Sequence, residues 1–312
     1  MTPELVKKRR IIEMGRLEAW LSQGRGSFHI ENLRIVRTLL VFMLTTLHLR
    51  RRGERNAQTP ALRRITVPLR GLPAAFEGYT LLHLSDLHLD GVAGLGARLA
   101  RMLDPLRPDL CVMTGDYRFE IDGPCRPACR EMAELLPCIH AGDGVMAVLG
   151  NHDFYDEAEA LTAMGARMLL NESAVVRRGD DCLWIAGVDD PHYYGTDDLG
   201  AALAGVPARA AIVLLAHSPE LYREAAARGV ALYLCGHTHA GQIVLPLLGA
   251  PLVNANCPRS MAAGLWRFED MTGFTSAGTG ASLVPVRFCC PGEVVLLTLT
   301  RDDHLEATTE RD

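Results

Sequence analysis

The stretch YTLLHLSDLHLDG, residues 79–91, begins as an apolar run and ends in polar groups. A short apolar run that stops at Ser, Asp and Gly is typical of a buried β-strand followed by a turn. Asp86 and His88 stand two positions apart at the end of the run. Alternate residues of an extended chain project to the same side, so the pair can hold one ligand together. The end of this strand is therefore predicted to carry a functional site.

Four more apolar runs are followed by polar groups in the same way. These groups are Asp116 after 109–114, Asn151, His152 and Asp153 after 144–149, His217 after 210–216, and His237 and His239 after 231–235. Gly115, Gly150 and Gly236 directly precede three of them, and a residue without Cβ lets the chain turn sharply and approach a bound ion. All five predicted strand ends thus offer carboxylate, carboxamide or imidazole groups.

Helical patterns alternate with these strands. We expect helices near 94–104, 127–136, 156–164, 197–204 and 218–227, and further strands at 182–188, 242–246 and 293–299. This alternation predicts an α/β fold, in which ligands gather at the carboxyl ends of the strands.

The donor types favour particular metals. Mixed Asp, His and Asn ligands without thiolate suit Mn, Fe or Zn better than a calcium cage or a cysteine-rich structural zinc site. The candidate ligands outnumber what one ion needs. Two divalent ions that share one carboxylate are the economical solution.

The ordered series D-x-H at 86–88, G-D at 115–116, G-N-H-D at 150–153, His217 and G-H-x-H at 236–239 resembles the calcineurin-like metallophosphoesterase superfamily. The flanking LPAAFEGYTLLHLSDLHLDG, GHTHAGQIVLP and GTGASLVPVRFCCPGEVVLLTL resemble a subgroup of membrane-associated phosphoesterases and UDP-2,3-diacylglucosamine pyrophosphatase-type enzymes. The resemblance covers roughly residues 66–300. Ala240 replaces the subgroup's usual second glycine, and the tail motif differs in its spacing and in Gly292.

The resemblance implies a four-layer αββα sandwich and a role for each matched residue. One ion would be held by Asp86, His88, Asp116 and His239. The second would be held by Asp116, Asn151, His217 and His237, so that Asp116 bridges the two ions. Manganese is the first expectation, with iron or zinc as alternatives. His152 would face the substrate and supply a proton to the leaving group, and Asp153 could orient its ring.

Three further residues are candidates for substrate contacts. Arg118 stands two positions after Asp116 and could pair with a phosphate, or it could be a plain surface arginine. His192 and Tyr193, in DDPHYYG after a predicted strand, could line the pocket or belong to an ordinary loop.

The N-terminal segment, residues 1–60, differs from the predicted phosphoesterase domain, residues 61–305, and from the tail, 306–312. Residues 1–70 carry 15 Lys and Arg against 5 Asp and Glu, and the remainder carries 17 against 32. The charge-free apolar part, Thr38–Leu49, would span about 18 Å as a helix, against about 30 Å for a bilayer core. Lys7–Arg10 lie in an earlier stretch in which Leu5, Ile12, Trp20 and Leu21 could form an apolar side. This composition predicts interfacial helices on anionic lipid, or helices packed on the main domain or on a second subunit.

Three functions remain open. The first is hydrolysis of a phosphodiester or pyrophosphate bond in a lipid-linked substrate such as a UDP-acyl-sugar. A soluble phosphodiesterase for nucleotides or nucleic acid is disfavoured because the acidic remainder repels polyanions, so no specific nucleic-acid binding is expected. The third is a non-catalytic binding scaffold. Such a protein is expected to lack part of the metal-ligand set, whereas this sequence has all seven ligands and His152.

The cellular setting follows from cysteine usage and from the flanks of the apolar run. The nine cysteines form no disulfide or zinc pattern, which favours reduced thiols. Three arginines and no small-residue cleavage site follow the apolar run, so export is not expected. We expect a cytoplasmic protein that binds peripherally to a membrane.

Overall fold

The computed structural model describes residues 2–15, 34–121, 124–245, 249–250 and 254–302. Trp20, Leu21 and the predicted tail 306–312 lie outside the described residues.

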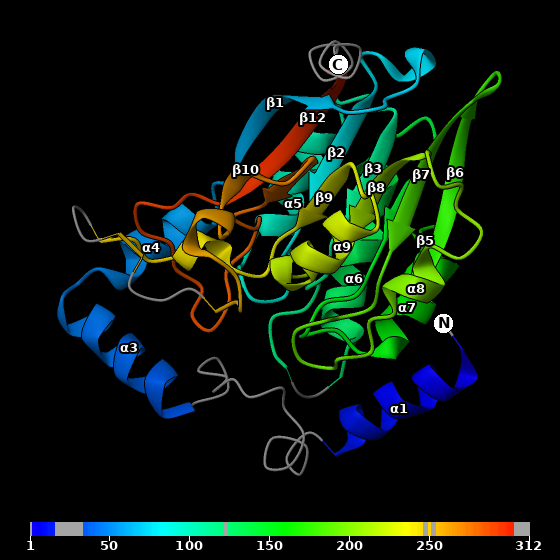
Figure 1. Ribbon diagram of the computed structural model, residues 1–312. Helices are drawn as coiled ribbons and strands as arrows, with labels where there is room; N and C mark the ends of the chain where they lie inside the picture. Colours follow the sequence, from blue (N-terminus) through cyan, green and yellow to red (C-terminus); the bar gives the residue numbers. More distant parts are fainter. Residues whose placement is uncertain (1, 16–33, 122–123, 246–248, 251–253, 303–312) are drawn as a thin grey trace.

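Two six-stranded sheets form the centre of the molecule (Figure 1). The first sheet has the order β1-β12-β2-β3-β4-β5 and the second has the order β10-β11-β9-β8-β7-β6. The strands are β1 (Ala61–Leu69), β2 (Thr80–Leu84), β3 (Leu110–Met113), β4 (Val145–Ala147), β5 (Arg167–Met168), β6 (Glu172–Arg178), β7 (Asp181–Gly187), β8 (Ala211–Leu215), β9 (Leu232–Cys235), β10 (Gly264–Phe268), β11 (Met271–Thr275) and β12 (Glu293–Arg301).

The α-helices of the described residues lie outside the two sheets (Figure 1). They are α1 (Pro3–Met14), α3 (Arg34–Thr46), α4 (Arg50–Ala57), α5 (Leu95–Leu103), α6 (Arg126–Leu135), α7 (Tyr155–Ala163), α8 (Leu199–Ala202) and α9 (Tyr222–Ala227). Helices α5, α6 and α7 pack on the first sheet, and α8 and α9 pack on the second. The result is the four-layer αββα sandwich that the resemblance implies.

The alternation of side chains along the strands explains the layers. In β2, Leu81 joins the core between the sheets, whereas Leu82 and Leu84 contact the helices outside. The inter-sheet core takes Val213 from β8 and Phe274 from β11. Because both faces of the central strands are covered, strands such as β3 and β8 are apolar throughout, as is usual for buried parallel strands.

The predicted strands occur with boundaries shifted by at most two residues, except for the one at 242–246. There the chain forms a short 3₁₀ turn, η5 (His239–Gly241), and Ile243 makes only an isolated bridge to Phe288. Gln242 has φ +48°, which removes the local chain from the extended region. The prediction of a strand here was wrong because an apolar run does not reveal a left-handed turn.

The basic N-terminal segment contains helices, as predicted. Helix α1 lies beside α7, and α3 and α4 lie at the other side of the molecule (Figure 1). Leu44 of α3 packs on Val284 and Val286, which follow β11. Among the described residues, no helix combines the length and the apolar character that a membrane span requires.

Candidate dinuclear metal centre

The Asp116 carboxylate lies at the centre of the candidate site. It follows β3, and its Oδ2 lies 3.3 Å from His217 Nε2, 3.6 Å from His88 Nε2 and 3.8 Å from His152 Nε2. Its Oδ1 accepts the backbone N–H of His152 at 2.9 Å. One carboxylate therefore faces imidazoles from three other strand ends.

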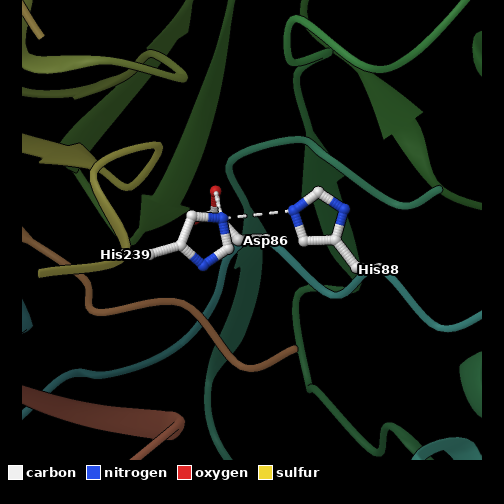
Figure 2. Close-up of side chains that lie close together, drawn as sticks. All are labelled: Asp86, His88 and His239. Carbon is white, nitrogen blue, oxygen red and sulfur yellow. Dashed lines mark hydrogen bonds and ion pairs between the residues drawn. The ribbon is translucent and has the colours of Figure 1, made fainter. Parts of the chain in front are cut away.

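One group of donors lies on each side of Asp116. On one side Asp86, His88 and His239 point toward one another (Figure 2). His239 Nε2 lies 3.4 Å from Asp86 Oδ1 and 3.2 Å from His88 Nε2. The three donor atoms lie within 4.8 Å of one another, close enough to hold one ion.

On the other side, Asn151 Oδ1 lies 2.9 Å from both His217 Nε2 and His237 Nδ1. Asp116, His217 and His237 form a second group whose donor atoms lie within 4.8 Å of one another. His88, Asp116 and His152 form a third group of the same kind. The structure thus brings all seven candidate ligands and His152 to one locus.

Backbone carbonyls orient three of the imidazoles. His88 Nδ1 contacts the Arg118 carbonyl at 2.7 Å, His217 Nδ1 contacts the Thr114 carbonyl at 2.8 Å, and His152 Nδ1 contacts the Phe119 carbonyl at 2.7 Å. Since a carbonyl only accepts, each Nδ1 carries a hydrogen and donates it. When such a ring is neutral, its lone pair is on Nε2, which faces the site.

The backbone at the site adopts unusual conformations. Five candidate ligands have positive φ: Asp86 (+50°), His88 (+40°), Asp116 (+59°), His237 (+69°) and His239 (+50°). Each such residue costs about 1–3 kcal/mol, which the surrounding structure must offset. Strain of this kind gathers at functional sites, where it aims side chains that ordinary turns would point elsewhere.

Two of the glycines permit close approach. A Cβ on Gly150 would lie 2.2 Å from Asp116 Oδ1, and one on Gly236 would lie 2.1 Å from Asp86 Oδ2. Gly115 has φ +92° and faces the Gly150 backbone. The space that a side chain would take is occupied by the carboxylates themselves.

The electrostatics separate the donors into an anion, Asp116, a protonated ring, His217, and two neutral rings, His237 and His239. Burial alone would raise the pKa of Asp116, but the His217 and His152 imidazoles outweigh it and hold this pKa well below its ordinary value. Burial opposes protonation of His217, yet Asp116 raises its pKa to about 10. Burial, with His192 near His237 and His88 near His239, lowers the pKa of both His237 and His239, which leaves these rings neutral.

Asp153 does not orient the His152 ring. Its carboxylate accepts backbone N–H groups from Asp116 at 2.7 Å, Tyr117 at 2.9 Å and Gly150 at 2.8 Å. Burial raises the pKa of Asp153 to about 6, and the charge of Asp116 adds to the rise. Neighbouring residues in a turn project in different directions. Asp153 therefore ties the loop after β4 to the loop after β3, while a carbonyl orients His152.

The three predicted substrate contacts lie in different surroundings. The Arg118 guanidinium is buried, 3.4 Å from Glu157 and 4.4 Å above the Phe154 ring. The His192 ring lies 4.1 Å from the His237 ring, centroid to centroid, with the planes tilted by 46°, and its Nδ1 is 2.9 Å from Glu220. Tyr193 donates its backbone N–H to Asp190 at 2.7 Å. The structure thus brings the His192 ring against a candidate ligand, and Arg118 contacts His88 through its backbone carbonyl.

A cavity of about 390 Å³ opens onto the donors. Asp116, Asn151, His152, His237 and His239 line its polar end. Its apolar walls are Leu40 and Met43 of α3 with Ile243, Leu245, Leu283 and Val284. The N-terminal segment thus contributes directly to the wall of the candidate site.

Two buried arginines were not predicted as parts of the site. Arg287 donates to the carbonyls of Gly280 at 2.6 Å and Ala277 at 2.7 Å and lies 3.2 Å from His239 Nδ1. It is the single charge in the apolar run LVPVRFCCPG. A lone charge in such a run indicates a buried side chain with polar partners, so this arginine could have been noticed in the sequence. Arg9 of α1 contacts the loop of Asn151 and His152, and its place in a basic run gave no such indication.

The donor set fits two divalent cations. His237 Nε2 is buried and has no hydrogen-bond partner in the described part of the chain. Imidazoles, a carboxamide oxygen and two carboxylates converge without a lysine or arginine among them. A buried carboxylate and an orphaned ring nitrogen are both stabilised by a bound cation.

Comparisons with known proteins agree with this arrangement. The family model for calcineurin-like phosphoesterases matches residues 79–241. The chain is 30% identical over 306 residues to a Danio rerio "transmembrane protein with metallophosphoesterase domain", covering 92% of this chain and 68% of that one. It is 28% identical over 231 residues to Escherichia coli phosphodiesterase YaeI, covering 71% of this chain and 82% of that one.

Among solved structures, the Haemophilus influenzae NAD nucleotidase aligns with a TM-score of 0.41 at 13% identity, over 64% of this chain and 45% of that one. The chain therefore spans less than half of that structure.

The chain belongs to the calcineurin-like phosphoesterase family. It is a phosphoester hydrolase of the metallophosphoesterase class, and members of this family use divalent metal ions.

Proposed function

We propose that the protein uses two divalent metal ions to hydrolyse a phosphodiester or pyrophosphate bond in a lipid-linked substrate such as a UDP-acyl-sugar. Asp86, His88, Asp116 and His239 hold one ion. Asp116, Asn151, His217 and His237 hold the other. Manganese is the metal we propose, with iron and zinc as alternatives. The predicted catalytic domain, residues 61–305, carries all of these ligands.

The single observation that carries the proposal is the position of Asp116 Oδ2 among three imidazole nitrogens at the polar end of an apolar cavity. A carboxylate shared between two donor groups suits a bridging ligand. When bound, a pair of divalent ions neutralises charge on the phosphoryl oxygens and lowers the pKa of a water molecule.

His152 supplies the proton that the leaving group needs. Its Nδ1–H is fixed on the Phe119 carbonyl, so Nε2 is the nitrogen that lines the cavity. A proton on Nε2 can pass to the leaving oxygen of a substrate held at the polar end. Asp153 keeps the loop of His152 in place through its three backbone N–H bonds.

The walls of the cavity support a substrate with an acyl chain. Leu40 and Met43 of α3 and Leu283 and Val284 form an apolar surface next to the donors. A nucleotide or a sugar phosphate offers such a surface little to bury, whereas an acyl chain gains about 0.8 kcal/mol per buried CH₂. Membership of a hydrolase family also disfavours the scaffold alternative.

The outer face of α3 supports binding to a membrane surface. Leu39 is 61% exposed, Phe42 67% and Leu47 58%. Arg50, Arg51 and Arg52 follow the helix and are exposed. Apolar side chains beside cationic ones suit the boundary of anionic lipid, and we propose a peripheral location on the cytoplasmic side. A second subunit is the alternative partner for this face.

The function can be tested with purified, manganese-loaded protein. Bis-p-nitrophenyl phosphate, p-nitrophenyl phosphate and a UDP-acyl-sugar are compared as substrates, and His152→Ala is compared with His140→Ala, an exposed histidine paired with Asp104. We expect hydrolysis of a diester or pyrophosphate. His152→Ala should lower kcat by about 10² to 10⁴ while binding manganese normally, and His140→Ala should match the wild type.

Equal rates for His152→Ala and the wild type would show that His152 is not the proton donor. A preference for the monoester over the diester and the UDP-acyl-sugar would exclude the proposed substrate class.

A further inference from the structure

Helix α1 is anchored to the catalytic domain by one charged side chain. Arg9 is its single buried residue, at 0% exposure, whereas Lys7 and Lys8 face solvent. This differs from the predicted interfacial helix, in which the cations of 7–10 meet lipid. A buried guanidinium is stable only when its donors are paired, so its partners define what α1 does.

The partners of Arg9 lie on two separate loops. Nη1 donates to Asp189 Oδ1 at 2.5 Å, in the loop after β7. Nη2 donates to the carbonyl of Asp153 at 2.7 Å and contacts that of Gly150 at 3.5 Å. The guanidinium also stacks on the Tyr194 ring at 3.9 Å. The planar guanidinium of Arg9 thus joins the loop after β4 to the loop after β7.

The loop that Arg9 holds is the one that carries Asn151 and His152. Gly150 and Asp153 flank these two residues directly, and both flanking carbonyls face Arg9. The side chain of Asp153 meanwhile accepts the N–H of Asp116. Arg9 therefore contacts the residues on either side of the proposed ligand Asn151 and the proposed proton donor His152. Through Asp153 it is also one contact away from the bridging carboxylate.

Other contacts of α1 hold the same region from outside. Glu13 accepts the Nε–H of Arg9 at 3.0 Å and the backbone N–H of Tyr155 at 2.8 Å. Lys8 donates to the Gly195 carbonyl at 2.9 Å. The helix spans from the loop after β7 to the start of α7.

We propose that Arg9 is a positioning residue for the metal centre, so that docking of α1 completes the active site. The inference rests on the proposed two-metal function. Without the guanidinium, two loop carbonyls lose a donor. Within the described residues, the Asp189 carboxylate then keeps only the Thr196 hydroxyl, at 2.6 Å, as a side-chain partner. The loop then relaxes, and the side chains of Asn151 and His152 no longer point toward the metal centre.

Arg9→Lys in the full chain tests the proposal. The lysine keeps the charge opposite Asp189 but cannot donate in two directions at once. We expect manganese binding, measured by titration calorimetry, to weaken by about 10- to 100-fold, as for other residues that orient metal ligands. In the metal-free protein, amide exchange at residues 150–155 should accelerate while the melting temperature stays close to that of the wild type.

Arg10→Lys is the matched control. Arg10 is 43% exposed on the same helix and pairs with Asp156 and Glu159 at the surface. It should leave both metal affinity and exchange unchanged. If Arg9→Lys melts below the assay temperature, Arg9→Gly with millimolar guanidinium replaces it. Recovery of metal affinity and amide protection supports the proposal, and failure to recover contradicts it.

Wild-type metal affinity and exchange rates in Arg9→Lys would overturn the inference. A wild-type protein that neither binds manganese nor hydrolyses any test substrate would instead overturn the proposed function. Exchange in the metal-free protein would still report on the Arg9 contacts in that case.

Discussion

At the scale of single residues, the site depends on backbone conformations that cannot be predicted from the chemistry of the side chains. The sequence was sufficient to predict which residue types gather at the strand ends, since carboxylates and imidazoles after apolar runs are visible in it. It could not reveal that Asp86, His88 and His239 have positive φ. Ala240, which replaces the subgroup's usual second glycine, also has φ +49°, a region in which glycine is less strained.

Gly150→Ala is predicted to disrupt the site through one methyl group. The new Cβ would lie 2.2 Å from Asp116 Oδ1 and 2.8 Å from His217 Cε1, so both side chains must move. We expect about 1–3 kcal/mol lower stability from overpacking, measured by urea unfolding, and a large loss of manganese affinity.

Gly142→Ala is the control for this change. Its Cβ would meet only the Asp109 carbonyl, at an ordinary 3.6 Å. It should leave stability unchanged or raise it slightly. Equal behaviour of the two variants would mean that close approach at Gly150 has no role.

At the scale of elements, α3 shows where an apolar helix needs structural context. The run Thr38–Leu49 predicted a helix that binds an apolar surface. Its two faces have different environments: Leu44 packs on Val284 and Val286, and Phe42 is exposed. Which residues belong to which face depends on the loop after β11, far away in the sequence. The contacts of Arg9 could not be predicted for the same reason, because Asp153 and Asp189 are distant from it in the sequence.

Phe42→Gln is predicted to weaken co-sedimentation with anionic liposomes by about tenfold. The estimate follows from losing roughly 1.5 kcal/mol or more of buried aromatic surface. Because Phe42 is 67% exposed, the melting temperature should change little. Deleting residues 1–60 would be a less specific test, since it also removes Arg9.

Leu265→Gln on β10 is the comparison variant. Leu265 is 46% exposed and lies outside the N-terminal segment. It should sediment like the wild type. A Phe42→Gln protein that sediments as fully as Leu265→Gln would favour a protein partner for α3 over lipid.

At the scale of the whole molecule, ion pairs connect the two sheets. Arg178 of β6, in the second sheet, donates to Asp143 Oδ2 at 2.6 Å in the loop before β4 of the first. Tyr79, before β2, donates its hydroxyl to the same oxygen at 2.5 Å. Burial opposes the effect, but these two donors hold the pKa of Asp143 below its ordinary value. The Asp143 carboxylate thus links the two sheets at the edge of the sandwich.

Asp143→Asn is therefore predicted to lower stability in a pH-dependent way. A depressed folded pKa adds stability that is complete above the unfolded pKa, about 3.9, and is lost as the pH falls through the folded pKa. We expect a loss of about 1 kcal/mol or less at pH 7, because the pair is partly exposed. The difference from the wild type should shrink below pH 4 in urea titrations.

Asp180→Asn serves as the reference variant, since Asp180 is exposed and lies in the turn between β6 and β7. Its stability should follow the wild type at every pH. A constant difference for Asp143→Asn across the acidic range would contradict the linkage.

The α/β class follows from local periodicity, which the sequence displays directly, whereas the four layers were implied by the family resemblance. Strands β1, β5, β6, β10 and β11 were not predicted. Charged residues such as Arg63, Arg64 and Arg177 interrupt the apolar patterns of β1 and β6, and Thr272 and Gly273 interrupt that of β11, which is buried. The other four are the edge strands of the two sheets. Edge strands expose one face to solvent, so their sequences resemble those of loops. Pairing across the chain, rather than propensity, makes them strands.

The pairing of β1 with β12 has a consequence for biosynthesis. Ala61 lies beside Glu293, and β12 separates β1 from β2 in the first sheet. During translation β1 leaves the ribosome early, yet its neighbour is made only near residue 301. Contacts between such distant segments form slowly. Until they form, nascent chains expose the edge of β2, and a chaperone that shields this edge would raise the yield of native protein.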